Sequence, residues 1–147
     1  MPYNKKGIFK IMKSFTLIFA VFIGYLLADI SVPISNLPQN AQNFIKNNFD
    51  ANIIHIKQSD DNFEILLSDG HQIELSLSGE WEEIRRYIGI ETKALPENIT
   101  LIIKNNFPNM KILKIKKEWE IYNLQLENKI KIYIDENGKI IGQTTDY

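Results

Sequence analysis

The chain has 147 residues, no cysteine and two histidines, His55 and His71. Without thiols, a disulfide framework, a thiolate metal site, a cysteine nucleophile and a lipid-modified cysteine are all excluded. The histidines show no metal-ligand spacing such as H-x-x-x-H. We therefore interpret them as ordinary strand or surface residues and expect no metal site.

Glycine is also sparse, and its seven copies are scattered along the chain. No glycine-rich phosphate loop and no G-x-S-x-G nucleophile elbow occurs. Residues 135–138, DENG, begin like a calcium loop but lack its twelve-residue pattern and terminal glutamate, so they predict a turn. The pair Glu82 and Glu83 is flanked by arginines and is more typical of surface ion pairs. We expect no cofactor, no catalytic residues and no enzymatic activity.

The charges are close to balanced, with a formal net charge of -1. Residues 1–28 hold four lysines and no acid, so the remainder has 13 basic and 18 acidic residues and a net charge of -5. An acidic body argues against a nucleic-acid partner, because phosphate binding needs a basic surface.

One long apolar run is present, FTLIFAVFIGYLLA at residues 15–28, after a lysine-bearing start. A basic start, an apolar core and a small residue, Ala28, are typical of a secretory signal peptide at residues 1–28. Met12 is an alternative start. An uncleaved membrane anchor is the other interpretation, although the run ends at Asp29, short of the roughly 20 residues of a spanning helix. In both cases we expect a periplasmic or secreted body whose membrane contact is limited to this segment.

A repeated stretch organises the rest of the chain. Residues 37–49, LPQNAQNFIKNNF, and residues 95–107, LPENITLIIKNNF, agree at eight of thirteen positions. Such a repeat indicates a duplication. Each copy carries an apolar stripe at helical spacing, which predicts helices that begin at Pro38 and Pro96 and end near Phe49 and Pro108.

Alternating, β-branched segments follow each helix and predict three antiparallel strands per copy: 53–58, 63–67 and 71–77, then 110–116, 119–127 and 129–134. A turn and a short stretch at residues 139–142 come last. The predicted fold is α+β, with an αβββ unit repeated in tandem, both helices on one face of the sheet and the other face open. The predicted parts are a linker (29–36), a first repeat (37–80), a connector (81–94), a second repeat (95–142) and a tail (143–147).

The connector is the least regular part of the prediction. Trp81, Ile84 and Ile88 lie near one helical face, and Glu82 and Arg86 form an i,i+4 acid–base pair. These spacings favour a short helix ending near Gly89. Alternatively, Trp81 forms a wall between the two sheets.

Several of these features together resemble one family of bacterial envelope proteins. They are the LP-led helix ending in NNF, the strand ending in Ser68-Asp69-Gly70, the strand closing at Gly79-Glu80-Trp81, and the second LP…NNFP unit. The chain resembles the β-lactamase-inhibitor-like, PepSY-like family over residues 37–142. At residues 127–129 it lacks the family's hairpin glycine, so that turn is expected to differ. The resemblance implies tandem αβββ units, an open sheet face that grips another protein, and no enzyme activity. Inhibition of a hydrolase is suggested only by the family's name.

The open sheet face is the predicted binding surface for an envelope protein. By alternation the first unit supplies an acidic half and the second a basic half, which would suit a bipolar docking surface. Trp81 and Trp119 are either interface anchors or core and edge fillers. Lysines at 111–117 form a solvated face or contact an acidic partner or an anionic membrane. The candidate protein-binding residues are Glu64, Gln72, Glu74, Trp81, Trp119, Asn123, Gln125, Lys129, Lys131 and Tyr133.

We therefore expect an exported, non-enzymatic binding protein of the bacterial envelope that recognises a protein partner. Inhibition of a hydrolase or peptidase is one form that this recognition would take. The alternative is a structural or assembly module tethered to the membrane by its N-terminal segment.

Overall fold

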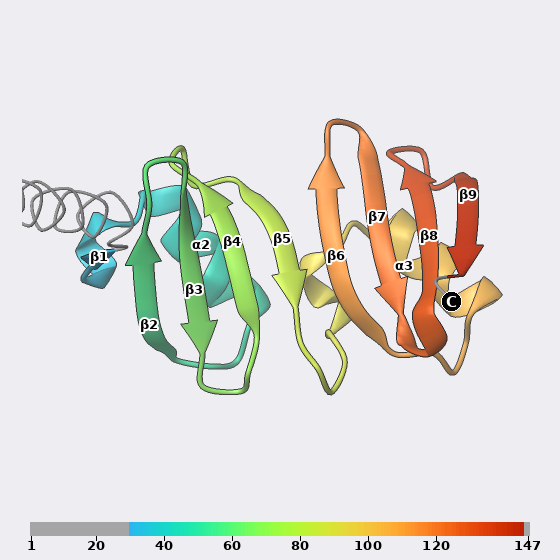
Figure 1. Cartoon of the computed structure of the whole chain (residues 1–147), viewed down its shortest axis with the longest axis horizontal. Coiled ribbons are helices and arrows are strands. Elements are labelled where there is room, and N and C mark those ends of the chain that lie inside the picture. The colour runs from blue at the N-terminus through green and yellow to red at the C-terminus, as the bar shows by residue number, and fades with distance from the viewer. Residues whose placement is uncertain (1–29, 146–147) are drawn as a thin grey trace, which may run out of the picture. The chain divides into compact units, whose positions relative to one another are not determined.

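A computed structural model describes residues 30–145 of the protein. Within this range the chain forms one nine-stranded antiparallel sheet, with two α-helices on one of its faces and the other face open (Figure 1). The strands lie in the sheet in the same order as in the chain, β1 to β9. The predicted signal segment, residues 1–28, lies outside the described residues.

Two units of a helix followed by strands make up the sheet. The first unit has α2 (Gln39–Asn48), then β2 (Ile53–Gln58), β3 (Asn62–Leu67), β4 (Gln72–Ser76) and β5 (Trp81–Arg85). The second has α3 (Glu97–Asn106), then β6 (Ile112–Glu118), β7 (Ile121–Leu126), β8 (Ile130–Asp135) and β9 (Ile140–Thr145). A two-residue strand, β1 (Ile30–Ser31), and the short 3-10 turns η1 (Ile34–Asn36), η2 (Thr92–Ala94) and η3 (Glu127–Lys129) complete the described chain.

The predicted α+β class, the antiparallel sheet and the open face are confirmed, but each helix is followed by four strands rather than three. The extra strand of the second unit is β9, which runs to Thr145, beyond the expected end at residue 142. The extra strand of the first unit is β5, so the prediction of a short helix in the connector was wrong. Residues 83–85 pair with β4 on one side and with β6 on the other. Hydrogen bonding on both sides of the strand outweighs the weak local preference that the helical spacing indicated.

The repeated LPxN residues fasten each helix to the last hairpin of its own unit. The Asn40 side chain donates hydrogen bonds to the Ser78 carbonyl (3.0 Å) and to a Glu80 carboxylate oxygen (3.3 Å) in the β4–β5 turn. The Asn98 side chain donates to the Glu136 carbonyl (2.8 Å) in the β8–β9 turn. Asn40 is exposed, and its side chain ties the start of the helix to a turn 38 residues away.

The repeated NNF residues close each helix. The Asn48 side chain donates to the Phe44 carbonyl, and the Asn106 side chain to the Ile102 carbonyl, both at 2.8 Å. The last carbonyls of a helix have no partner within the helix, so a side-chain donor stabilises this end. Phe49 then leaves the helix in an extended conformation and is buried in the core. The duplicated stretch therefore forms the same contacts at both helix ends in both units.

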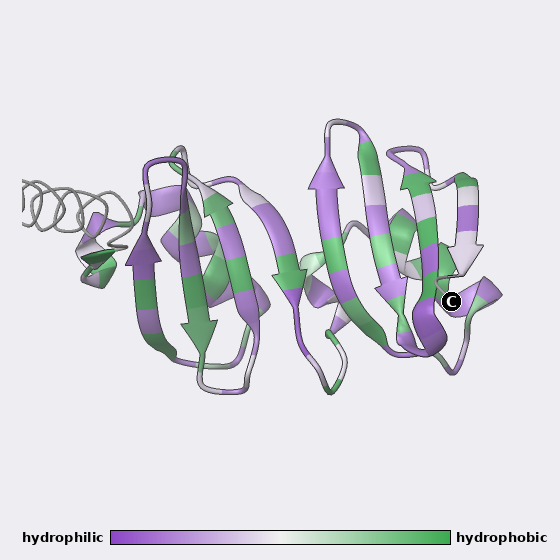
Figure 2. Cartoon of the chain, in the orientation of Figure 1, coloured by the Kyte–Doolittle hydropathy of each residue, from purple (hydrophilic) through white to green (hydrophobic). Residues whose placement is uncertain are grey.

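The core lies between the helices and one face of the sheet. Hydrophobic and hydrophilic residues alternate along the strands (Figure 2), as the period of a pleated strand requires. Among the predicted inward residues, Phe63, Ile65 and Leu67 of β3 are buried, and so are Tyr122, Leu124 and Leu126 at the corresponding positions of β7. The opposite side of the same strands forms the open face.

The turn that lacks the family's glycine does differ from its counterpart. Gly70 of the β3–β4 hairpin has a φ of +89°, which glycine tolerates. In η3 of the second unit, Asn128 and Lys129 both adopt left-handed conformations, with φ of 64° and 62°. β8 therefore begins at Ile130, and Lys129 belongs to the turn rather than to the strand.

Among residues 30–145, neither α-helix is long and apolar enough to cross a membrane.

The open face of the sheet as candidate binding site

Strand register places the polar side chains of the open face in rows that run across the sheet. Glu64 of β3 pairs with Glu74 of β4, which pairs with Glu83 of β5. Lys57 of β2 stands at one end of this series and Lys116 of β6 at the other. We call Glu64, Glu74 and Glu83 the acidic row.

Like charges directly opposite each other on neighbouring strands destabilise a sheet, so the acidic row needs compensation. Lys57 Nζ lies 3.6 Å from Glu64 Oε1, and Arg85 Nη2 lies 3.9 Å from Glu74 Oε2. The Asn62 side chain donates a 2.6 Å hydrogen bond to Glu74 Oε1. Glu64 and Glu74 are thus paired with cations of the first unit and do not form a uniform negative surface.

Glu83 is the most enclosed charge of the row, since only 5% of the residue is exposed. Its Oε1 lies 2.6 Å from Arg85 Nη2, and its Oε2 lies 2.9 Å from Lys114 Nζ. The Arg85 contact is an ion pair without hydrogen-bond geometry, because Oε1 has no hydrogen-bond partner among the described residues. A buried carboxylate is tolerated only when it is paired in this way. Glu83 therefore joins β5 of the first unit to β6 of the second.

A neighbouring row of the same face carries no acid. Register aligns Gln72, Arg85, Lys114, Gln125, Lys131 and Thr144 across strands β4 to β9. We call Arg85, Lys114 and Lys131 the basic row. The glutamates of the open face and the residues of the basic row therefore lie in two separate rows.

Two hollows lie along these rows. The larger, of about 380 Å³, is on the first unit, and its polar lining comprises His55, Lys57, Glu64, Gln72, Glu74 and Arg85. The smaller, of about 140 Å³, lies where the two units meet and is lined by Gln72, Arg85, Arg86, Tyr87, Leu113, Lys114 and Gln125. The open face thus offers a polar hollow and a smaller one with basic and apolar walls.

Most of the residues predicted for a docking face do lie on the open face. They are Glu64, Gln72, Glu74, Asn123, Gln125, Lys131 and Tyr133. Lys129 does not, since it lies in η3 with a left-handed backbone. The predicted acidic half also contains Lys57 and Arg85 next to its glutamates, so it is a mixed rather than an acidic surface.

Trp81 lies on the helix side of the sheet. Its ring stacks on Phe44 of α2, with 6.2 Å between centroids and 12° between planes, and lies 6.2 Å from Tyr122 of β7. Lys117 Nζ sits over the same ring, 5.9 Å from the centroid. Trp81 is therefore a packing residue between the two units of a single sheet, so it forms no wall between two sheets and is not part of the open face.

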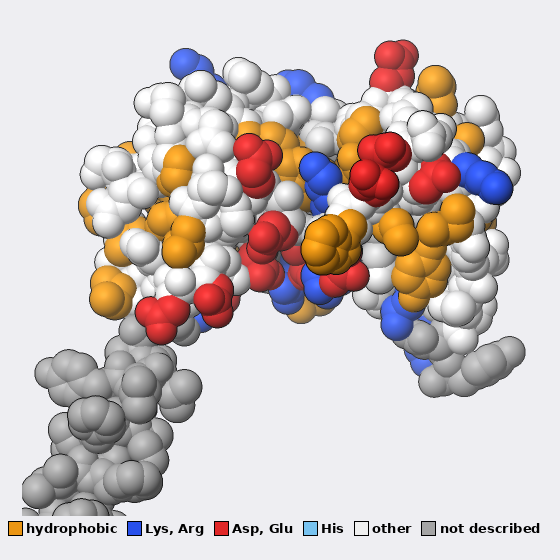
Figure 3. Space-filling model, turned by 90° about the horizontal axis from the view of Figure 1, so that it is seen from above, with side chains coloured by type: hydrophobic (Ala, Val, Ile, Leu, Met, Phe, Trp, Pro, Cys, Tyr) orange, Lys and Arg blue, Asp and Glu red, His pale blue; other side chains and the backbone are white. Residues whose placement is uncertain are grey.

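Trp119 has the opposite environment. It lies in the β6–β7 turn, with 96% of its surface exposed and a left-handed φ of 57°. This end of the sheet is uppermost in Figure 1, and Figure 3 shows hydrophobic side chains there among acidic and basic ones. Trp119 fills neither the core nor a sheet edge.

Sequence reasoning did not assign three charged residues to the open face, namely Glu83, Arg85 and Lys114. Glu83 was expected in a surface ion pair; it does pair with Arg85, but it is buried. Glu83 and Arg85 belong to β5, which helical spacing assigned to a helix. Lys114 was noted as part of a lysine run, but its partner was not. A period-2 alternation at residues 83–85 would have placed Glu83 and Arg85 on one face, whereas Lys114 joins them only through the register of β5 and β6.

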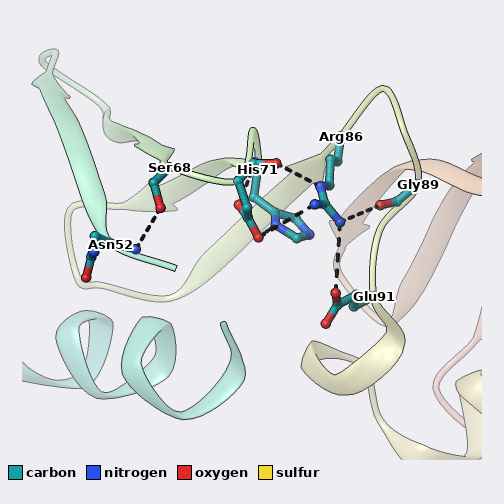
Figure 4. A network of polar contacts seen from close by, with 7 residues as sticks. Asn52, Ser68, His71, Arg86, Gly89 and Glu91 are labelled. Atoms are coloured by element: carbon teal, nitrogen blue, oxygen red, sulfur yellow. Dashed lines mark hydrogen bonds and ion pairs between the residues drawn. The ribbon is translucent and has the colours of Figure 1, made fainter. Parts of the chain in front are cut away.

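At the other end of the sheet, a polar network surrounds His71 (Figure 4). His71 is 1% exposed, and its Nδ1 lies 2.8 Å from Asp69 Oδ2, while the His71 backbone N–H donates to Asp69 Oδ1 at 3.1 Å. The other ring nitrogen, Nε2, is buried without a hydrogen-bond partner among the described residues, and the ring packs 4.9 Å from that of Phe49. His71 is thus a core residue held by one carboxylate.

Arg86 extends this network to the connector. Its Nε donates to the Asp69 carbonyl (3.0 Å) and its Nη1 to the Gly89 carbonyl (3.2 Å). Burial raises the pKa of the Asp69 carboxyl, but hydrogen bonds from His71 and the charges of His71 and Arg86 outweigh it and hold that pKa below its ordinary value of 3.8. At the corresponding positions of the second unit stand Asn128 and Ile130, so the network exists only in the first.

His55 and His71 lie in different environments and do not form a metal site together. His55 lines the larger hollow, whereas His71 is buried at the hairpin. Within residues 30–145, no group of three or more His, Cys, Asp or Glu side chains is arranged to hold a metal ion. In the 135–138 turn, Asp135 Oδ1 accepts the backbone N–H groups of Asn137 (3.0 Å) and Lys139 (2.8 Å), as expected of a turn.

Comparison with known proteins supports the fold and points to one family. A family model described as "Putative beta-lactamase-inhibitor-like, PepSY-like" matches residues 27–76 and 61–142. A search of curated proteins found no match.

Solved structures from two Bacteroides species share the fold. One, from Bacteroides thetaiotaomicron, is described as a "putative calcium-regulated periplasmic protein"; it is 26% identical, with a TM-score of 0.71, and the match covers 80% of this chain and 97% of that one. Another, a periplasmic protein of the DUF2874 family from Bacteroides vulgatus, is also 26% identical with a TM-score of 0.71, and the match covers 81% and 98% of the two chains.

Proposed function

The chain belongs to the β-lactamase-inhibitor-like, PepSY-like family, and on that premise we propose that it is a non-enzymatic protein of the bacterial periplasm. In this proposal it binds a protein partner through its open sheet face. The observation that carries the proposal is the pair of charged rows on this face. Ion pairs hold the side chains of the acidic row and those of Arg85 and Lys114, and Glu64, Glu74 and Arg85 border a hollow of about 380 Å³. Fixed side chains lose little conformational entropy when a partner binds, which favours recognition.

The location rests on two supports. Related structures are described as periplasmic, and the N-terminal 28 residues carry the pattern of a signal peptide. The duplicated helix ends support a further part of the proposal, that the two helix-plus-strand units arose from one ancestral unit. Inhibition of a hydrolase or peptidase is the form of binding that the family's name suggests.

The second candidate is an assembly module that stays tethered to the membrane. The apolar run at residues 15–28 favours it if the segment is not cleaved. Sequencing the N-terminus of the protein isolated from cells decides between the two, since a start at Asp29 removes the tether.

Site-specific photocrosslinking tests the binding proposal. In the full chain, p-benzoylphenylalanine replaces Tyr133, on β8 of the open face, or Leu101, an exposed residue of α3 on the opposite side. Irradiation of intact cells is expected to yield a crosslinked protein from position 133 and not from position 101. Equal crosslinking at both positions, or crosslinking from α3 alone, would refute binding through the open face.

A further inference from the structure

The loop after β5 exposes two large apolar side chains next to each other. Tyr87 is 88% exposed and Ile88 is 67% exposed. Large apolar residues in such positions gain nothing for folding, whereas tyrosine is enriched among the residues that dominate protein interfaces. The pair therefore requires an explanation outside the stability of the fold.

Both ends of this loop are fixed to the rest of the sheet. The Arg86 N–H donates to the Leu113 carbonyl (3.0 Å), and the Ile90 N–H donates to the Ile112 carbonyl (2.8 Å). Between them, the Gly89 N–H closes a turn onto the Arg86 carbonyl at 3.1 Å. The loop is thus a short, hydrogen-bonded projection from the sheet.

The Arg86 side chain fixes the loop from beneath. Only 15% of this side chain is exposed, and its guanidinium reaches the carbonyls of Asp69 and Gly89 (Figure 4). Gly89 has a φ of +107°, a conformation that favours glycine. Arg86 thus holds Tyr87 and Ile88 in a defined position, and a partner that binds them need not order the loop.

Hollows adjoin the two side chains. Tyr87 forms part of the smaller open-face hollow of about 140 Å³, where the charged walls are Arg85, Arg86 and Lys114 and no carboxylate contributes. The nearest acid of the row, Glu83, is 5% exposed, so its charge lies below the surface. Ile88 borders a hollow of about 320 Å³ beside α3, with apolar walls from Ile103, Phe107 and Met110. The hollow beside Tyr87 is therefore basic, whereas the hollow beside Ile88 combines apolar walls with two lysines, Lys104 and Lys111.

We propose that the loop 86–89 is the docking point for a segment of a partner protein, and that this segment carries a carboxylate beside a large apolar side chain. This inference rests on the proposed function. The carboxylate lies in the smaller open-face hollow, against Arg85 and Lys114, and the apolar side chain packs on Tyr87 or beside Ile88. Charge complementarity selects such a segment, because the lining is cationic while the body of the protein is acidic overall. Arg86 acts as a positioning residue for the loop.

Photocrosslinking from position 87 of the full chain tests this assignment, with Leu101 as the negative control and Tyr133 as the independent probe of the open face. Irradiation in intact cells is expected to crosslink position 87 to one protein. Mass spectrometry of the crosslinked peptide is expected to find Asp, Glu or a chain terminus next to an aliphatic or aromatic residue. A segment without a carboxylate, a lipid, or a second copy of this chain would overturn the proposal.

A charge variant provides the matched test. Lys114→Gln is expected to lower the crosslinking yield from position 87 by about fivefold, whereas Lys114→Arg, which keeps the charge, leaves it within about twofold. Circular dichroism confirms that both variants fold, and equal yields from the two would contradict the proposed carboxylate. Crosslinks from position 133 without crosslinks from position 87 would refute this docking point and leave the proposed function standing. Failure at both positions would refute both.

Discussion

Glu83 and Lys114 meet at the junction of the two helix-plus-strand units, with 2.9 Å between Glu83 Oε2 and Lys114 Nζ. The pair is diagonal, since Glu83 is directly opposite Lys116 and Lys114 is opposite Arg85. Register between β5 and β6 covers only residues 83–85 and 114–116. A short junction of this kind gives each contact across it a large share in holding the units together.

Lys114→Met should therefore destabilise the protein by about 1–2 kcal/mol, because it removes a hydrogen-bonded charge from a buried carboxylate while keeping the apolar stem. Urea unfolding followed by circular dichroism measures the change. Lys104→Met, at an exposed position of α3, is the control and should change the free energy of unfolding by less than about 0.5 kcal/mol. Equal effects of the two substitutions would show that Glu83 does not depend on Lys114.

The two tryptophans should respond in opposite ways to truncation. Trp81→Ala removes the ring between Phe44 and Tyr122 and should cost about 2–3 kcal/mol, somewhat less than a fully buried aromatic. Trp119→Ala should cost less than about 0.5 kcal/mol, because that side chain is 96% exposed. Thermal unfolding by circular dichroism, which needs no tryptophan reporter, compares them. A costly Trp119→Ala would mean that its turn is packed more tightly than the structure shows.

The Asp69 network predicts a defined dependence on pH. Because the folded-state pKa of Asp69 is depressed, its contribution to stability is fully present above the ordinary value of 3.8 and is lost as pH falls through the folded-state value. Asp69→Asn removes this titration, so the difference in unfolding free energy between wild type and variant should be largest near neutral pH and shrink below about pH 4.

Urea titrations of both proteins at several pH values provide the measurement. Asp135→Asn is a suitable comparison, because Asp135 also accepts backbone N–H groups in a turn but forms no hydrogen bond or ion pair with a histidine or an arginine among residues 30–145. A difference between wild type and Asp69→Asn that stays constant from neutral pH to pH 3 would rule out the proposed role of the Asp69 charge.

Two glycines with nearly the same backbone conformation allow the cost of backbone strain to be measured apart from the cost of a steric clash. Gly70 has a φ of +89° with nothing within 4 Å of an added Cβ, whereas Gly79 has a φ of +87° and an added Cβ would lie 2.5 Å from Asn40 Oδ1 and 2.9 Å from Pro38 Cβ. Gly70→Ala should cost about 1 kcal/mol from the backbone alone. Gly79→Ala should cost about 2–3 kcal/mol, because it also displaces the Asn40 hydrogen bonds. Chemical unfolding of both variants checks the order.

Local patterns were sufficient for much of the fold. The stripe of Ile45 and Phe49 and the alternation of Ile73 and Leu75 predicted which side of each element is buried, since both follow from the periods of helix and strand. The helix predicted from the spacing of Trp81, Ile84 and Ile88 was wrong. β5 forms a strand because it pairs with β4 and β6, and a local sequence period carries no information about those neighbours. The hydrogen bond of Asn40 was not predicted for the same reason, because its partner lies 38 residues away.

The composition of the open face was predicted in outline for a similar reason. Alternation correctly placed Glu64, Glu74 and Tyr133 on one face. It could not show that Glu74 shares Arg85 with the buried Glu83, because cross-strand register decides which side chains meet. Nor could it predict the left-handed turn that removes Lys129 from the strand, since only the backbone conformation shows this.

The order of the strands has a consequence for how the chain folds. In the described part of the chain, every strand pairs only with its neighbours in sequence, so no pairing has to wait for a distant segment. Short loops close at little entropic cost, and a low contact order favours rapid folding. A chain that emerges N-terminus first can therefore add β2 to β9 one after another to a growing edge. At each step the last strand added is the template for the next.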